Sequence, residues 1–299
     1  MKYRFLTCDV FTEARFGGNP LAVLPEADGL NAAQMQRIAR EFNYSETAFV
    51  LSPERGHTRR VRIFTPTREV PFAGHPNIGT AFTLAHEGAL GIISSSTTVT
   101  FEEQAGLVEI LIEPATNGAL WCELAAPEPL AIGQQVPAEV IAEALSLDVD
   151  HASQAVHRPC VASVGLPFVF AELASRDALE NARFTMTGLE KIADLGITPD
   201  LFAYCRSDDQ FDIRARMFAP FDGVPEDPAT GSANCALAGL LCSHLDESST
   251  SGRWRVAQGV EMGRPSTLDI RATRQDGQVT GTWVGGHTVP VSVGWIRVS

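Results

Sequence analysis

The chain has 299 residues, enough for two domains, and its 44% hydrophobic and 20% charged residues are typical of a globular protein. Its 36 acidic residues outnumber its 23 lysines and arginines, and the resulting net charge of −13 makes nucleic acid an unfavourable partner. No apolar run approaches the roughly 18 residues of a membrane span. Asp9 interrupts the first apolar run too early for a signal peptide, so we expect a cytoplasmic protein with reduced cysteines.

Short segments rich in β-branched and aromatic residues dominate the chain, and helical patterns are fewer. Strands and helices do not alternate regularly, which favours an α+β architecture over a doubly wound sheet. In chain order, we expect strands at residues 5–11, 47–51, 60–64, 107–112, 167–173, 211–218, 268–272 and 289–298. Amphipathic helices are expected at residues 31–42, where Asn31 and Gln34 form a capping box, and at 137–147 and 187–195.

Two further predicted helices, at residues 75–88 and 231–245, have long uncharged bodies (residues 77–85 and 232–242). A helix that is apolar on all sides is buried on all sides. Both helices are too short to cross a membrane. We therefore expect each of them to be a central helix surrounded by sheet.

The segments before these two helices resemble each other. Phe, Pro, Val and Pro recur at a constant offset of 154 between residues 64–71 and 218–225. Residues 74–75 then align with residues 231–232 at an offset of 157, which implies three inserted residues in the second copy. The sequence thus predicts an internal repeat of strand, turn, small-residue loop and buried helix, and hence two similar halves.

Gly74 and Gly231 stand where the two buried helices begin. Free N–H groups and the helix dipole can bind an anion there without a lysine or arginine, and residues 69–157 contain neither. Glycine also lets a ligand approach the backbone. We therefore predict a carboxylate-binding site, while a simple role in tight strand-to-helix turns stays open for both glycines.

Several polar side chains near these loops have both a structural and a functional interpretation. Asp227, Thr230 and Ser232 precede or begin the second helix, where they could cap it or face a ligand. His75 is either a core residue or a ligand contact, and the positive helix end should lower its pKa and keep it neutral. Glu46 stands at the mouth of an apolar strand; if it is buried in a cleft rather than solvated, its pKa rises and it can shuttle a proton.

Other chemistries find little support. Lys2 lies at the terminus and Lys191 on the polar face of a predicted helix, so a pyridoxal Schiff base is not expected. The six cysteines form no CxxC pair, the seven histidines do not cluster, and HExxH, GxSxG, P-loop and dinucleotide motifs are missing. We therefore predict an enzyme or binding protein that uses no metal and no cofactor.

Together, these segments resemble the phenazine-biosynthesis PhzF-type isomerase family, which shares its fold with diaminopimelate epimerase. The matching stretches run in order over nearly the whole chain: residues 9–12, 16–23, 43–50, 64–66, 70–76, 223–233 and 258–265. The resemblance implies two lobes, each a central buried helix wrapped by a barrel-like, mostly antiparallel sheet, with the site between them. We place the lobes at residues 1–125 and 126–285, with a strand at 286–299 that returns to the first lobe. Family members are often homodimers, so a homodimer is expected.

The resemblance also implies roles for individual residues. The family's catalytic glutamate matches Glu46, and its other site residues match His75, Asp227 and Ser232, with backbone contributed by Gly74 and, at the second helix, by Gly231. The related epimerase carries two cysteines where this chain has Gly74 and Asp227, so a two-thiol mechanism is not expected.

The reaction that the resemblance implies is a proton shift within a small cyclic amino or hydroxy carboxylate similar to trans-2,3-dihydro-3-hydroxyanthranilate. Two alternatives stay open, because fold alone does not fix function. One is an epimerase or other proton-transfer enzyme acting on a different small carboxylate. The other is a non-catalytic small-molecule or protein-binding module on the same scaffold.

Overall fold

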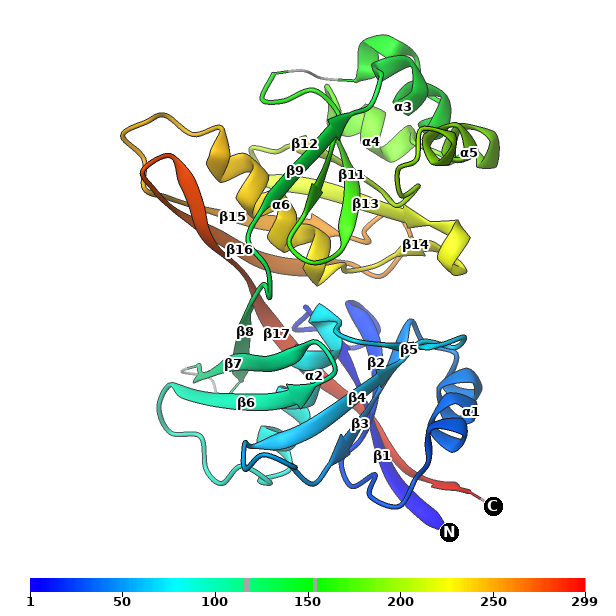
Figure 1. Cartoon of the computed structure of the whole chain (residues 1–299), viewed down its shortest axis with the longest axis vertical. Helices are drawn as coiled ribbons and strands as arrows, with labels where there is room; N and C mark the ends of the chain where they lie inside the picture. Colours follow the sequence, from blue (N-terminus) through cyan, green and yellow to red (C-terminus); the bar gives the residue numbers. More distant parts are fainter. Residues whose placement is uncertain (116–118, 153–154, 299) are drawn as a thin grey trace. The chain divides into compact units, whose positions relative to one another are not determined.

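The computed structural model describes residues 1–115, 119–152 and 155–298, and its chain divides into two compact units (Figure 1). Unit 1 consists of Met1–Ala125 and Gly285–Ser299, and unit 2 of Ala126–Val284. The long last strand, β17 (Gln278–Arg297), therefore contributes residues to both units. Each unit combines a mostly antiparallel sheet with one central helix, which confirms the predicted α+β fold with two similar halves. No helix among the described residues is long and apolar enough to cross a membrane.

The strands of unit 1 close into a barrel. β17 pairs with β1 on one side and with β8 on the other, and the pairs between them link every neighbour in the ring. The pairs β2–β3 and β4–β6 are parallel and the others with a printed register are antiparallel. The bounds are β1 Lys2–Val10, β2 Asn19–Leu24, β3 Glu46–Leu51, β4 Arg59–Phe64, β5 Glu69–Val70, β6 Thr97–Glu103, β7 Gly106–Pro114 and β8 Leu120–Ala125.

Helix α2 (Gly74–His86) lies inside this barrel and contacts β1, β2, β3, β7 and β8. Its residues from Gly74 to Leu84 are all buried, as its uncharged sequence predicts. A Cβ atom at Gly79 would lie 2.5 Å from Leu21 Cδ2, so a small residue lets the sheet approach this closely. Helix α1 (Ala32–Phe42) is the predicted amphipathic helix, and the expected capping box of Asn31 and Gln34 is present.

Unit 2 repeats this plan. Its strands pair in the order β9, β10, β11, β12, β13, β15, β16, with β14 as a further partner of β13. Helix α6 (Gly231–Ser243) is buried on all sides like α2 and has the same length. The remaining bounds are β9 Ala131–Gln135, α3 Ala138–Leu145, β10 Cys160–Ser163, β11 Pro167–Glu172, α4 Arg176–Asn181, α5 Met186–Asp194, β12 Leu201–Arg206, β13 Ile213–Ala219, β14 Val224–Asp227, β15 Ser251–Gln258 and β16 Ser266–Gln275.

The internal repeat is confirmed, with one correction to its alignment. In each unit one strand (β4 or β13) pairs in parallel with a later strand (β6 or β15). Arg62 forms a two-bonded ion pair with Glu69, and Arg216 forms the same pair with Glu226. Glu69 is thus equivalent to Glu226, at the offset of 157. The three extra residues therefore lie earlier than predicted, in the turn after β13, where unit 2 has a 3₁₀ turn at Pro220–Asp222.

The strands were harder to predict than the helices. All five predicted helices exist, although α2 begins at Gly74 rather than with Pro76 as its first residue. All eight predicted strands exist too, whereas nine further strands in the described residues were not predicted. Strand β12 is an example: it is apolar and buried on both faces, and a short apolar run does not distinguish a strand from a helix.

Candidate active site

Unit 1 brings Glu46 and His75 together. Glu46 is the first residue of β3, and His75 is the second residue of α2. His75 Nε2 lies 3.5 Å from Glu46 Oε2, and both atoms are shielded from solvent. The side chain of Glu46 as a whole keeps 20% exposure, against 6% for His75. Glu46 is therefore a half-buried carboxyl group whose inner oxygen faces an imidazole.

Burial lowers the pKa of His75 to about 3, so the imidazole is neutral at physiological pH. The predicted direction of the shift is confirmed, with burial as its cause. A neutral imidazole can accept a hydrogen bond from a protonated carboxyl group or donate one to a carboxylate. The Glu46–His75 contact can therefore adapt to either protonation state of Glu46.

The first turn of α2 has no side-chain cap. The N-cap residue is Ala73, whose methyl group cannot accept a hydrogen bond from the N–H groups of Gly74 and the residues that follow it. Asn77 instead donates from Nδ2 to the Ala73 carbonyl oxygen at 3.0 Å, which ties the loop before the helix to the helix itself. This turn carries the positive end of the helix dipole next to Gly74 and His75.

Unit 2 gathers Asp227, Gly231 and Ser232 within one short segment. Asp227 ends β14 and is buried, while Gly231 and Ser232 are the first two residues of α6. Helix capping by Asp227, Thr230 or Ser232 was one interpretation of the sequence, and for the N-cap residue Thr230 it is wrong. The Thr230 side chain caps nothing: its Oγ1 donates to Asp227 Oδ2 at 2.5 Å. The second helix therefore also begins without a side-chain cap from its N-cap residue.

The sequence analysis did not identify Gln258, which organises the unit 2 loop. Its fully buried amide donates from Nε2 to the Asp227 carbonyl oxygen at 2.8 Å and to Thr230 Oγ1 at 3.0 Å. Its Oε1 accepts from the Thr230 N–H at 3.2 Å and from Asn234 Nδ2 at 2.8 Å. One residue at the end of β15 thus fixes the loop and the first turn of α6.

Arg216 was missed as well. Its guanidinium group is 5% exposed, pairs with Glu226 through two hydrogen bonds of 2.9 Å, and also donates to the carbonyl oxygens of Leu179 and Ala182. Because Glu226 precedes Asp227, Arg216 fixes the strand that presents Asp227. A signal was available: Arg62 and Arg216 share the offset of 154, and Glu69 and Glu226 share the offset of 157.

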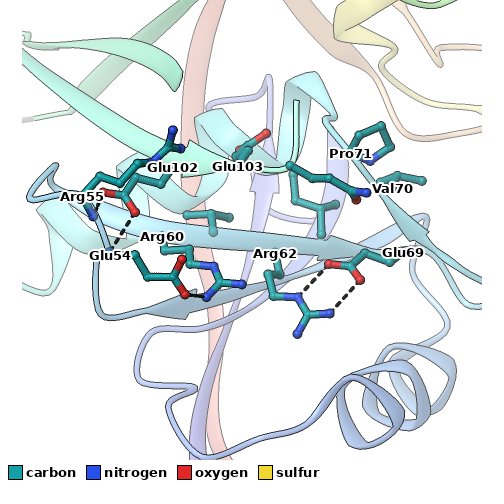
Figure 2. Close-up of a pocket in the computed structure, with 12 residues that line it drawn as sticks. Glu54, Arg55, Arg60, Arg62, Glu69, Val70, Pro71, Glu102 and Glu103 are labelled. Carbon is teal, nitrogen blue, oxygen red and sulfur yellow. Dashed lines mark hydrogen bonds and ion pairs between the residues drawn. The ribbon is translucent and has the colours of Figure 1, made fainter. Parts of the chain in front are cut away.

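A pocket of about 470 Å³ in unit 1 is lined by residues of β4, β5 and β6 and of the loops beside them, Pro71 and Glu103 included (Figure 2). Its arginines Arg60 and Arg62 are paired with Glu54 and Glu69, and the Glu102 carboxylate accepts hydrogen bonds from three backbone N–H groups. None of the six predicted site residues is among those that line it in the described part of the chain.

No group of three or more metal-binding side chains occurs in the described ranges. The six cysteines are all buried thiols, as expected for small apolar residues. Cys235 lies inside α6 and is buried. Lys191 is exposed on α5 and forms an ion pair with Glu143.

Comparisons with known proteins agree with this architecture. The family model described as phenazine biosynthesis-like protein matches residues 8–294. An uncharacterized isomerase from Mesorhizobium japonicum is 38% identical over 97% of each chain. A trans-2,3-dihydro-3-hydroxyanthranilate isomerase from Pseudomonas fluorescens is 34% identical, with 98% of this chain and 99% of the relative covered.

The solved structures agree in fold. A phenazine biosynthesis protein of the PhzF family from Bacillus anthracis superposes with a TM-score of 0.88, covers 100% of both chains and is 23% identical. A match over nearly the whole chain by the family model, and relatives above 30% identity, decide the family. The chain belongs to the phenazine biosynthesis-like (PhzF) family and is an isomerase.

Proposed function

We propose that this protein is a cofactor-independent isomerase that moves a proton within a small cyclic amino or hydroxy carboxylate similar to trans-2,3-dihydro-3-hydroxyanthranilate. Glu46 is the acid–base group that removes a proton from one ring carbon and returns it to another on the same face. The relatives named for that reaction, at about 34% identity, support the substrate class. Epimerisation of a different small carboxylate on the same scaffold is the alternative reaction.

The observation that carries the proposal is the contact between Glu46 and His75 at the uncapped start of α2. A proton shuttle needs a carboxyl group that can be charged in one step and neutral in the next. Glu46 has one oxygen shielded beside a neutral imidazole and part of its side chain still exposed. Because His75 carries no charge, it does not hold Glu46 permanently as a carboxylate, as a lysine or arginine would.

The proton transfer is balanced within the substrate and needs no oxidant or reductant. The Glu46 carboxylate takes a proton as a ring C–H bond breaks, and the negative charge spreads into the substrate. The protonated Glu46, whose side chain is partly exposed and can exchange its proton with water, then delivers a proton to a second carbon. A positioned acid–base group of this kind contributes about 10²–10⁴-fold to the rate, and the rest comes from orientation and charge stabilisation.

In this proposal the other predicted residues hold the substrate and assist proton placement. The backbone N–H groups at Gly74 and Gly231 bind the substrate carboxylate, since both helices begin without a side-chain cap from their N-cap residue. His75 and Asp227 assist proton transfer and hold the amino group, and Ser232 donates a hydrogen bond. We also propose that the enzyme is a homodimer, which light scattering of the purified chain tests.

The test is a pair of assays on Glu46→Gln with trans-2,3-dihydro-3-hydroxyanthranilate. Glutamine keeps the shape of the side chain but cannot carry the proton, so kcat falls by about 10³-fold while binding changes little. Glu41→Gln, an exposed carboxylate on α1, is the control and keeps full activity. Full turnover by Glu46→Gln contradicts the shuttle.

Deuterium exchange in ²H₂O distinguishes the alternatives. Exchange into substrate with retained configuration supports the isomerase, and exchange with inversion at one carbon indicates an epimerase. Asp227→Asn, assayed in the same way, tests whether the unit 2 loop takes part in the same reaction.

A further inference from the structure

The end of strand β6 in unit 1 is equivalent to the end of β15 in unit 2. Arg60 of β4 pairs with Glu102 of β6, and Arg214 of β13 pairs with Ala257 of β15. Arg60 and Arg214 are related by the repeat offset of 154. The next residue along each later strand is therefore also equivalent, and that residue is Glu103 in unit 1 and Gln258 in unit 2.

The partners of these two residues are equivalent as well. Asn77 and Asn234 are the fourth residues of α2 and α6, and each donates from Nδ2 at 3.0 Å to the carbonyl oxygen of the N-cap residue of its helix. Asn234 also donates to Gln258. In unit 1, the Asn77 side chain is the polar neighbour that lowers the pKa of the Glu103 carboxyl group, whose two oxygens are buried without a hydrogen-bond partner among the described residues.

Glu103 points into the interior of unit 1. Along β6, Val99, Phe101 and Glu103 share one buried face, and Glu103 is 8% exposed with both carboxyl oxygens shielded. The hairpin after it is joined to the loop before α2, because the Ala105 N–H donates to the Pro71 carbonyl oxygen at 3.1 Å. Glu103 therefore lies between the end of β6, that loop and the first turn of α2.

We propose that Glu103 is the unit 1 counterpart of Gln258: as a neutral carboxylic acid it accepts a hydrogen bond from Asn77, donates one to the loop before α2, and so positions Gly74 and His75. A protonated carboxyl group offers one acceptor oxygen and one O–H donor, in nearly the shape of the Gln258 amide. A carboxylate has no donor. This inference rests on the proposed function, in which Gly74 and His75 bind and act on the substrate.

Burial supports this protonation state, since it raises the pKa of Glu103 to about 8, against a smaller lowering by Asn77. Charged groups on the elements around Glu103 already have partners of their own. Arg62 on β4 is paired with Glu69. Glu102 is bound by backbone N–H groups, and His75 on α2 is neutral. Glu46 on β3 is the remaining ionisable neighbour of that turn.

A consequence distinguishes the two units. Above pH 8 Glu103 ionises and loses its donor, whereas the Gln258 amide keeps its hydrogen bonds at any pH. Activity should therefore fall at alkaline pH because Glu103 in unit 1 ionises, while Gln258 in unit 2 contributes nothing to this fall. Glu103→Gln makes the two units alike and should remove that dependence.

The experiment compares the wild type with Glu103→Gln between pH 6 and 10, each normalised to its own kcat/KM at pH 7. We expect the variant to retain about tenfold more of its activity than the wild type at pH 9.5, where most of the Glu103 is ionised. Glu102→Gln is the matched control: it loses backbone hydrogen bonds but should keep the alkaline profile of the wild type. Superimposable profiles of wild type and Glu103→Gln overturn the inference.

Thermal unfolding gives a readout that needs no substrate. When folding raises the pKa of a carboxyl group, the protein becomes less stable as the pH rises from the unfolded-state pKa to the folded-state pKa of that group. The melting temperature of Glu103→Gln relative to the wild type should therefore increase between pH 5 and 8 and level off above. A difference in melting temperature that does not change with pH contradicts the inference, even if no isomerase activity is detected. A wild-type protein without activity on the tested substrate contradicts only the proposed function.

Discussion

In unit 1, Arg62 binds Glu69 and the loop that follows leads into α2; in unit 2, Arg216 binds Glu226 and the loop leads into α6. An equivalent asparagine in each helix, Asn77 or Asn234, donates a hydrogen bond to the carbonyl oxygen of the residue before the helix. The side chains at the helix starts differ, since His75 in α2 corresponds to Ser232 in α6. The acids also differ: Glu46 comes from a neighbouring strand, while Asp227 ends β14, directly before the loop that leads into α6, and accepts a hydrogen bond from Thr230.

This comparison separates the parts that fix the backbone from the parts that do chemistry. Arginine–glutamate pairs and helix-starting asparagines recur because both units must hold an uncapped helix start in place. The ionisable groups do not recur, which is expected if the two helix starts have different chemical tasks. Equivalent substitutions in the two units test whether a residue fixes the backbone or takes part in the chemistry.

The largest expected effect comes from breaking the two arginine–glutamate pairs separately. Arg216→Met leaves a nearly buried Glu226 carboxylate and two backbone carbonyl groups without a partner, and should cost about 3 kcal/mol of unfolding free energy. Arg62→Met breaks the more exposed pair, 20% and 30% accessible, and should cost about 1 kcal/mol or less. Urea denaturation of both variants measures the difference, and equal losses would show that burial does not distinguish the two pairs.

The local features of the fold could be predicted from the sequence. The capping box at Asn31 requires only two residues three positions apart, and the burial of α2 and α6 follows from their lack of charge. Gly74 and His75 begin α2, and Asp227 lies shortly before the start of α6, so all three stand at recognisable helix starts. In each case the signal lies within one turn or one short segment.

Long-range partners could not be predicted in this way. Gln258 binds the carbonyl group of Asp227, 31 residues earlier, and Arg216 binds carbonyl groups at the end of α4 and at its C-cap residue, more than 30 residues earlier. Arg216 also lies in a strand whose residues are all buried, where alternation would place arginine on a solvent face. Only the pairing of β13 with β14 brings its carboxylate partner close enough to bury it.

An acid-stability measurement sharpens the comparison between His75 and Ser232. Buried His75 has a folded-state pKa of about 3, below the unfolded value of about 6.5, so the unfolded chain binds the proton more readily. The free energy of unfolding should therefore fall as pH decreases from 6.5, by about 2 kcal/mol at pH 5 from this group alone. His75→Asn should remove that part of the pH dependence in denaturant titrations, while Ser232→Ala should leave it intact. The same slope in His75→Asn and the wild type would assign the acid sensitivity to other groups.

The smallest expected effect distinguishes the two central helices by their packing. An alanine at a helical glycine gains about 0.5–1 kcal/mol in backbone entropy, but only where its methyl group fits. At Gly79 the new Cβ would lie 2.5 Å from Leu21 and 2.7 Å from Val10, so overpacking should exceed the gain and Gly79→Ala should cost about 1 kcal/mol. At Gly239 the nearest atoms lie at 3.1 Å on Leu130 and Thr282, so the two terms should nearly cancel. Thermal unfolding of the two variants measures this difference, and a stabilised Gly79→Ala variant would show that the barrel around α2 can expand more readily than the sheet around α6.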